Sequence, residues 1–231
     1  MKIRIATITI LAPLTISVIL WLPEFVFAGM LVVISTLAAW EWCRLISNQI
    51  SQVMRCGYSA MVATVLVGSL LYEPSWVPIT LGASMVWLFL SGKIVYQIFF
   101  PSSGSISSSP LLGIVLLVSG PVALIAIQNN LEQGRLLVLL CCVVVWASDT
   151  FAYVVGRRFG RKKLAPIISP GKTLEGALGG IVGGLVTGTA LFFVLMENNK
   201  VGCITLEMWY FVAISIAVTG IIGDLVESAV K

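Results

Sequence analysis

The 231-residue sequence contains no histidine. This absence excludes the side chain most often used for acid–base catalysis near neutral pH, and it excludes zinc sites built from cysteine and histidine pairs. The five cysteines (Cys43, Cys56, Cys141, Cys142 and Cys203) form no CxxC pair, so we interpret them as apolar filler. Any chemistry must therefore depend on carboxylates, lysines, hydroxyls or a metal ion.

Charged residues are also scarce, at 10% of the chain, whereas an ordinary soluble domain has about 25%. Apolar residues make up 58% of the positions. They gather in eight stretches close to the roughly 20 residues that a helix needs to cross about 30 Å of hydrocarbon. The composition therefore predicts an all-α, polytopic transmembrane bundle of about eight spans.

The eight apolar stretches lie at residues 4–22, 25–41, 57–72, 77–99, 111–128, 136–156, 174–196 and 208–226. The first has no small-x-small cleavage site before Pro23, so we interpret it as an uncleaved span. We divide the chain into an N-terminal transmembrane region, 1–134, with five spans. The C-terminal region, 135–231, has three spans and carries the unusual polar residues.

The distribution of Lys and Arg predicts the orientation. If the N-terminus lies in the cytoplasm, twelve of the fourteen Lys and Arg residues fall on the cytoplasmic side. Only Arg135 and Lys200 fall outside, together with the loop residues Glu24, Glu73, Glu132, Glu197 and Glu207. This is the asymmetry that the positive-inside rule describes. We therefore expect both termini to be cytoplasmic.

Asp149 lies within the sixth apolar stretch. An acidic side chain at the centre of a spanning helix costs about 2.5–3.5 kcal/mol on insertion scales, so such residues usually have a function. Farther along, the seven-residue segment 157–163 contains five cations: Arg157, Arg158, Arg161, Lys162 and Lys163. For this cluster two interpretations stay open, since it could bind an anionic ligand or serve only to fix topology and contact anionic headgroups.

The segment 169–176 is similar to a phosphate-binding P-loop but lacks the first glycine, because Pro166 occupies that position, and no strand is expected before it. We predict instead a helix start with Ser169 as N-cap and Pro170 in the first helical position. Lys172 in that first turn would oppose the helix dipole unless an anion, such as a phosphate, binds there. Gly176, Gly180, Gly184 and Gly188 follow at four-residue spacing and predict close helix packing.

Two further carboxylates lie near the end of the last span. Asp224 and Glu227 are three residues apart and so share a helix face, and Glu227 can pair with Lys231. Together with Asp149 they would supply the hard oxygen ligands that Mg²⁺ accepts beside substrate phosphates.

Three segments of the chain, in this order, resemble the phosphatidate cytidylyltransferases, also called CDP-diacylglycerol synthases. They are residues 146–153 with Gly156, Arg157 and Gly160, residues 169–176, and residues 223–228 with Lys231. Trp40 and Glu41 also look like family features. The resemblance covers the chain from about residue 140 to its end.

The resemblance implies transfer of a cytidylyl group from CTP to phosphatidic acid, giving CDP-diacylglycerol and pyrophosphate in phospholipid biosynthesis. It also implies Mg²⁺, with a second, monovalent cation and a homodimer left open, and no nucleic-acid partner. Because CTP is cytosolic and phosphatidic acid lies in the lipid bilayer, we expect a bacterial inner-membrane protein whose active site faces the cytoplasm.

The resemblance also suggests roles for individual residues. We predict Lys172, Glu175 and Asp224 as catalytic residues, with Glu175 positioning Lys172 or a second cation. We predict Arg157, Arg158, Arg161, Ser169, Lys172 and Thr173 as substrate-binding residues, and Asp149, Asp224 and Glu227 as metal ligands.

The chain departs from the family pattern at its end. Family members continue with a Lys-Asp pair and a signature containing His-Gly-Gly and Asp-Arg, whereas this sequence stops at Lys231. If the metal site draws an aspartate from that segment, we expect this chain to be either a truncated form or an inactive remnant of the family.

Two other functions use the same residues. A transporter of a small anion would use the cations as its pathway, but it would usually have broken helices and internal symmetry, and neither is evident in the sequence. A CTP-dependent lipid or polyprenol kinase would differ in the phosphorus atom attacked, and so would release CDP instead of pyrophosphate.

Overall fold

The computed structural model describes residues 2–47, 49–100, 109–131, 133–197 and 204–230, with side chains described from Ala12 onwards. Four residues named above, Glu132, Lys200, Cys203 and Lys231, lie outside the described residues, as does the serine-rich segment 101–108.

Eight long helices dominate the described chain, as the apolar stretches predict. They are α1 (Lys2–Trp21), α2 (Glu24–Ile46), α3 (Gln52–Leu71), α4 (Trp76–Phe99), α5 (Pro110–Asn130), α6 (Gly134–Phe159), α7 (Leu174–Glu197) and α8 (Leu206–Val230). Within the described residues, α2 to α8 are long and apolar enough to cross a membrane, and α1 is apolar over Ala12–Trp21. The predicted all-α membrane bundle is confirmed.

Several helices extend beyond their apolar stretches into polar sequence. Helix α2 runs on to Ile46, and α3 begins at Gln52 instead of at residue 57. Capping explains where two of the helices begin, because a side-chain oxygen satisfies an amide that has no partner within the helix. Ser51 Oγ accepts from Met54 N at 3.3 Å, and Ser109 Oγ accepts from Leu112 N at 3.1 Å.

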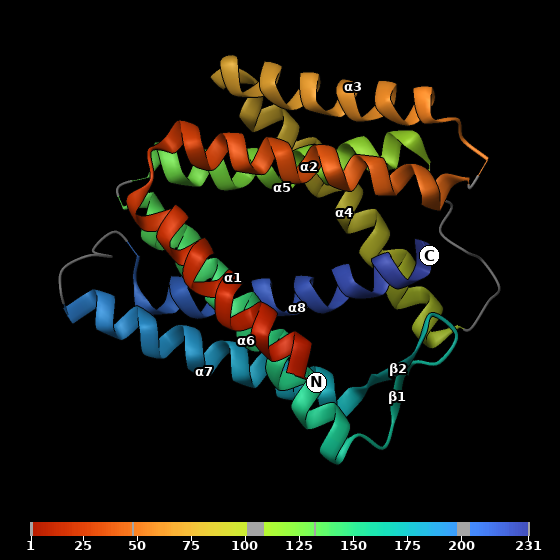
Figure 1. Cartoon of the computed structure of the whole chain (residues 1–231). Helices are drawn as coiled ribbons and strands as arrows, with labels where there is room; N and C mark the ends of the chain where they lie inside the picture. Colours follow the sequence, from red (N-terminus) through yellow and green to blue (C-terminus); the bar gives the residue numbers. More distant parts are fainter. Residues whose placement is uncertain (1, 48, 101–108, 132, 198–203, 231) are drawn as a thin grey trace.

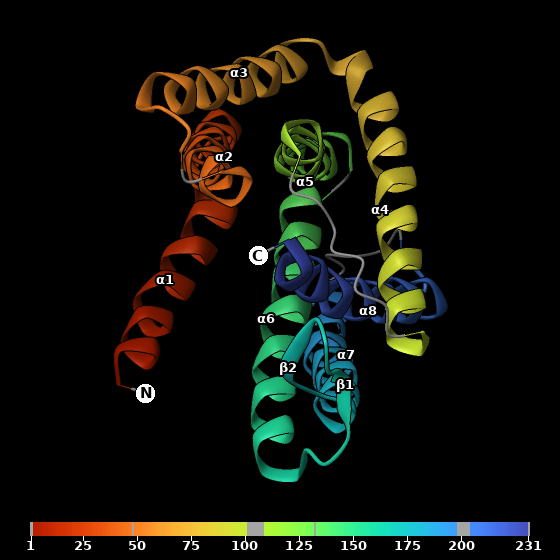
Figure 2. The same cartoon turned by 90° about the vertical axis from the view of Figure 1, so that its right-hand side faces the viewer.

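The loops lie at two opposite ends of the bundle (Figure 1). The α5–α6 junction and the C-terminal end of α7 lie on the left of that view, and the C-terminal ends of α2 and α8 lie on the right. At the left-hand end, Nη2 of Arg135 at the start of α6 lies 3.8 Å from Oε1 of Glu24 at the start of α2. This ion pair connects the α5–α6 junction with the α1–α2 junction. Figure 2 looks onto the right-hand end and shows α3 lying across α2 and α5.

A short hairpin connects α6 to α7 at this right-hand end. Strand β1 (Lys163–Ala165) pairs antiparallel with β2 (Ser169–Thr173), with Lys163 opposite Thr173 and Ala165 opposite Ser169. Figure 2 shows the hairpin in front of α7. It is the one sheet within the described residues.

The prediction of a helix start at Ser169 and Pro170 is wrong, because both residues belong to β2 and α7 begins at Leu174. Thr173 takes the capping role, since its Oγ1 accepts the N–H of Gly176 at 3.2 Å. Lys172 therefore precedes the helix instead of lying in its first turn. A strand does precede this segment, contrary to expectation, but an antiparallel hairpin is not the strand–loop–helix unit of a P-loop.

Apolar packing explains why this segment folds as a hairpin. Ala165 is 2% exposed and belongs to a buried cluster with Leu90 and Ile94 of α4 and with Leu225, Val226 and Val230 of α8. We call this cluster the hairpin seat. Leu164 and Ile168 pack against it. Burial of these apolar side chains in the seat stabilises the hairpin.

The glycine row of α7 packs closely against α6, as its spacing predicts. A Cβ atom built on Gly176 would lie 2.9 Å from the carbonyl oxygen of Ala152, and one on Gly184 would lie 3.0 Å from that of Val144. One on Gly180 would lie 2.9 Å from the carbonyl oxygen of Ser148. Because these neighbours are backbone atoms, the glycines determine how closely α6 and α7 approach.

Replacing Gly180 by valine should therefore push α6 and α7 apart. We expect a destabilisation of roughly 1–3 kcal/mol, the usual cost of overpacking. The change would also reduce activity, because Ser148 precedes Asp149. Thermal unfolding followed by size-exclusion chromatography in detergent measures the effect. Gly82→Val is the matched control, since a Cβ atom on Gly82 meets nothing within 4 Å. Equal stability of the two variants would contradict this account of the packing.

Candidate functional site

Helix α6 presents three polar side chains along one face. Asp149, Tyr153 and Arg157 are each four residues apart, so they follow one another along the helix surface. Arg157 Nη1 donates a hydrogen bond to the hydroxyl of Tyr153 at 2.8 Å. The row thus leads from a carboxylate within the span to a guanidinium at the helix end, where the hairpin begins.

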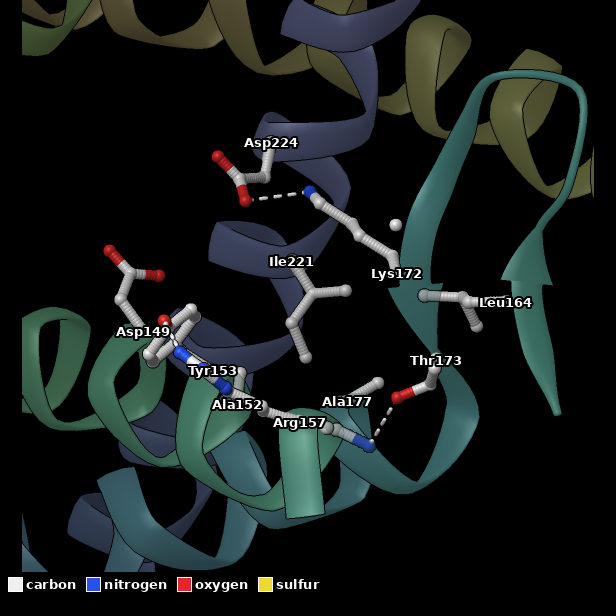
Figure 3. Close-up of a pocket in the computed structure, with 13 residues that line it drawn as sticks. Asp149, Ala152, Tyr153, Arg157, Leu164, Lys172, Thr173, Ala177, Ile221 and Asp224 are labelled. Carbon is white, nitrogen blue, oxygen red and sulfur yellow. Dashed lines mark hydrogen bonds and ion pairs between the residues drawn. The ribbon is translucent and has the colours of Figure 1, made fainter. Parts of the chain in front are cut away.

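Lys172 of β2 reaches across to helix α8, where its Nζ lies 2.6 Å from Oδ2 of Asp224 (Figure 3). The Lys172 side chain is 25% exposed and that of Asp224 is 55% exposed. The Nζ atom itself is buried, and the ion pair does not have the alignment of a hydrogen bond. Among the described residues, Nζ therefore has an ion-pair partner but no hydrogen-bond acceptor.

These groups surround one cavity of about 580 Å³, within the usual size range of small-molecule sites. Helices α6, α7 and α8 and the hairpin all contribute to it. It is lined by Asp149, Ala152, Tyr153, Gly156, Arg157, Leu164, Gly171, Lys172, Thr173, Gly176, Ala177, Ile221 and Asp224. Figure 3 shows Asp149 on α6 and Asp224 on α8, with Lys172 approaching from the hairpin.

The glycines at the α6–α7 crossing let the two helices approach closely beside the cavity. A Cβ atom on Gly156 would lie 3.0 Å from Thr173 Oγ1 and 3.3 Å from the Cα of Gly176. One on Gly176 would lie 3.0 Å from the Cα of Gly156. The backbones of the two helices therefore touch here, which holds Thr173 next to the end of α6.

The cavity brings together five of the ten residues that the sequence singled out as site candidates. Asp149, Arg157, Lys172, Thr173 and Asp224 all line it. The other five, which are Arg158, Arg161, Ser169, Glu175 and Glu227, are not among the lining residues.

Those five residues lie on or next to elements that line the cavity, without lining it themselves. Arg158 and Arg161 are exposed beyond the end of the polar row on α6, and Ser169 is half-buried at the start of β2. Glu227 is exposed on α8, one turn beyond Asp224. Glu175 binds backbone amides instead of Lys172, since its carboxylate accepts from Arg161 N at 3.0 Å and from Lys162 N at 3.2 Å.

Two carboxylates of the cavity are suited to a hard divalent cation. Within the described parts of the chain, no three His, Cys, Asp or Glu side chains gather closely enough to hold a metal, so Asp149, Asp224 and Glu227 do not form one group. Mg²⁺, however, is commonly bound by one or two carboxylates together with substrate phosphates and water. Asp149 and Asp224 fit that kind of site, and the ammonium of Lys172 beside them would meet the phosphates.

Sequence reasoning missed Tyr153 and the apolar part of the lining. Tyr153 lies four residues after Asp149 and four before Arg157, so helical spacing could have placed it on the same face. Leu164, Ala177 and Ile221 carried no signal of their own, because apolar residues are the background of a membrane protein. They add apolar surface to a cavity whose polar groups are the carboxylates, the lysine, the arginine and the hydroxyls.

Comparison with known proteins agrees with this arrangement. The sequence model of the cytidylyltransferase family matches residues 2–231. A phosphatidate cytidylyltransferase of Pseudomonas aeruginosa is 31% identical over 236 residues, which cover 100% of this chain and 83% of the relative.

Two further relatives with the same description match over shorter regions. One from Haemophilus influenzae is 34% identical over 149 residues, which cover 60% of this chain and 51% of the relative. One from Bacillus subtilis is 42% identical over 107 residues, which cover 46% of this chain and 38% of the relative.

Proposed function

This chain belongs to the cytidylyltransferase family, and from that membership and the geometry of the cavity we propose that it transfers a cytidylyl group from CTP to phosphatidic acid. The products are CDP-diacylglycerol and pyrophosphate. The observation that carries the proposal is a single cavity containing Asp149 and Asp224 together with Lys172 and Arg157, at the end of a membrane bundle.

The reaction needs little acid–base chemistry, which suits a chain without histidine. An oxygen of the lipid phosphate attacks the α-phosphorus of CTP, and the bond from that phosphorus to the β-phosphate oxygen breaks, releasing pyrophosphate. A lipid phosphate is already an anionic nucleophile. Catalysis then depends mainly on positioning the two phosphates and on stabilising the charge that develops.

Different residues of the cavity position the phosphates and stabilise their charge. Lys172 contacts a phosphate of CTP through its buried Nζ. Arg157, held by Tyr153, contacts a phosphate group nearer the end of α6. Thr173 adds a hydroxyl between them, and Arg158 and Arg161 attract the anionic substrates from outside the cavity. Ser169 and Glu227 would act at the edges of the site.

The family uses a divalent metal ion, and we propose Mg²⁺ bound by Asp149 and Asp224. The ion would neutralise phosphate charge as CTP binds. A second, monovalent cation and a homodimer remain predictions, as does the division of the chain at residues 134 and 135.

We place the site on the cytoplasmic side of a bacterial inner membrane. Cations concentrate at the end of the bundle that carries the hairpin, including Arg44, Arg157 and Arg158 in the last turns of α2 and α6. Arg135 and its partner Glu24 lie at the opposite end. The positive-inside rule assigns the end with more cations to the cytoplasm, where CTP is found.

Labelled CTP distinguishes this function from its alternatives. We expect the purified chain, in nanodiscs containing phosphatidic acid, to move label from [α-³²P]CTP into lipid and to release pyrophosphate. Lipid labelled from [γ-³²P]CTP, with CDP released, would instead identify a kinase. Anion flux into proteoliposomes without any labelled lipid would identify a transporter. Nanodiscs without phosphatidic acid are the control.

A further inference from the structure

Glu175 makes an unusual pair of contacts in the first turn of α7. Its Oε2 accepts the backbone N–H of Arg161 at 3.0 Å, and both of its carboxylate oxygens lie 3.2 Å from the backbone nitrogen of Lys162. A carboxylate bound by two successive amides forms charge-assisted hydrogen bonds, which are stronger than neutral ones. Glu175 thereby ties the exit from α6 to the start of α7.

These contacts close the root of the hairpin. Next to them, the N–H of Leu174 donates to the carbonyl oxygen of Lys162 at 2.8 Å, and Lys163 pairs with Thr173 in the strand ladder. Lys172 is the next residue along β2. At the other end of β1, Ala165 is anchored in the hairpin seat. The place of Lys172 therefore depends on a hairpin fixed at its root by Glu175.

We propose that Glu175 is a positioning residue that holds the hairpin root closed and so aims Lys172 into the cavity. It is neither a catalytic group nor a metal ligand, because its carboxylate is directed to backbone amides and it does not line the cavity. The role of Lys172 in this inference rests on the proposed function. The closure of the root does not.

A general helix effect is the competing explanation. An acidic residue in the first turn interacts favourably with the helix dipole wherever it occurs. Glu207 provides the matched control, since it is an exposed acidic residue in the first turn of α8, at the end of the bundle opposite the hairpin. Glu207→Ala removes the dipole interaction of one helix but leaves the hairpin root intact.

Three substitutions at Glu175 separate positioning from chemistry. Glutamine keeps the length and an acceptor oxygen but loses the charge, whereas aspartate keeps the charge but is one methylene too short to reach the same amides. We expect Glu175→Gln to stay within about threefold of the unmodified chain, because a neutral amide oxygen still accepts an N–H. Glu175→Asp and Glu175→Ala should raise the KM for CTP by about 10- to 100-fold, with a smaller change in kcat, since displacing Lys172 by about 1 Å weakens its contact with phosphate.

Limited trypsin digestion in nanodiscs reports whether the hairpin root is closed, and it does not depend on enzymatic activity. Arg161, Lys162 and Lys163 are exposed and lie in the segment that Glu175 binds. We expect cleavage after these residues to be about tenfold faster in Glu175→Ala and Glu175→Asp, the size of effect produced by losing a hydrogen bond to a charged group. Glu207→Ala should be cleaved at the rate of the unmodified chain, and Glu175→Gln should stay within about threefold of that rate.

Three results would overturn the proposal. One is unchanged cleavage in Glu175→Ala. Another is a Glu175→Gln variant that loses kcat as severely as Glu175→Ala while its root stays protected, because the charge would then be acting on the reaction. The third is an Asp variant more active than the Gln variant. If even the unmodified chain produced no CDP-diacylglycerol, the proposed function would fail, and the digestion would still decide the closure of the root.

Discussion

Replacing Asp224 by asparagine is expected to reduce CDP-diacylglycerol formation by roughly 10²–10³-fold, the usual effect of removing one group that stabilises charge in a transition state. Asparagine has nearly the same shape but lacks the negative charge. The variant would lose a carboxylate suited to Mg²⁺, and the ammonium of Lys172 would lose the partner that lies 2.6 Å away. Both losses affect polar groups that line the cavity.

The same substitution should hardly change stability. The Asp224 side chain is 55% exposed, so water already screens its ion pair with Lys172. Such exposed pairs contribute about 0–1 kcal/mol. A large loss of rate without a loss of folded protein would therefore report on chemistry. Initial rates with [α-³²P]CTP, together with thermal unfolding of the same preparations, measure the two effects.

Glu73→Gln is the control for this experiment, because Glu73 is an exposed carboxylate in the short helix η1 (Glu73–Ser75) that precedes α4. It should keep the rate of the unmodified chain. Turnover by Asp224→Asn within a few-fold of that rate would remove Asp224 from the site and leave the cavity without its metal ligand on α8.

Replacing Lys172 by methionine is expected to lower kcat/KM for CTP by about 10²-fold, mainly through KM. Methionine preserves most of the aliphatic length, so the hairpin should stay folded while the charge is lost. In the described part of the chain, Nζ lies 2.6 Å from Oδ2 of Asp224 and has no hydrogen-bond acceptor, so a phosphate would supply the acceptor that it lacks. Lys172→Arg should retain part of the activity, since its charge is kept but its planar fork differs in shape.

Lys93→Met is the matched control for this second substitution. Lys93 is exposed on α4, with its ammonium 5.8 Å from the ring centroid of Phe89, and it does not line the cavity. Steady-state kinetics with varied CTP and saturating phosphatidic acid would separate KM from kcat. An unchanged KM for CTP in Lys172→Met would contradict the placement of Lys172 at the nucleotide.

The membrane fold could be predicted from the sequence because its determinants are local. Each span is an apolar run long enough to cross the bilayer, and each expected turn interrupts such a run. The close packing of α7 against a neighbour could also be predicted, since Gly176, Gly180 and Gly184 share one helix face, although the spacing does not identify α6 as that neighbour. Spacing alone contains that information.

The hairpin could not be predicted from local sequence in the same way. Ser169 and Pro170 have the features of a helix start. Burial of Ala165 against α4 and α8 outweighs this local preference. Leu90 of α4 and Leu225 of α8 are distant in the sequence, so no local pattern shows that they meet around Ala165. Tertiary packing often overrides propensity in short segments of this kind.

The candidate site was predicted in composition but not in pairing. Asp149 attracted attention because an acidic residue is costly within a span. Lys172 did so because it would oppose a helix dipole, and Asp224 because it shares a helix face with Glu227. The partner of Lys172 proved to be Asp224, fifty-two positions away, whereas Glu175, three positions away, binds amides of the hairpin root. Proximity in sequence therefore suggested the wrong neighbour for Lys172.

Photo-crosslinking with a CTP analogue that carries an azide on its terminal phosphate tests most directly whether this cavity is the nucleotide site. The account predicts labelled peptides from residues 149–176 or 221–224, and it predicts that excess CTP abolishes the labelling. CTP-sensitive labelling confined to other segments, such as α1 to α3, would contradict it.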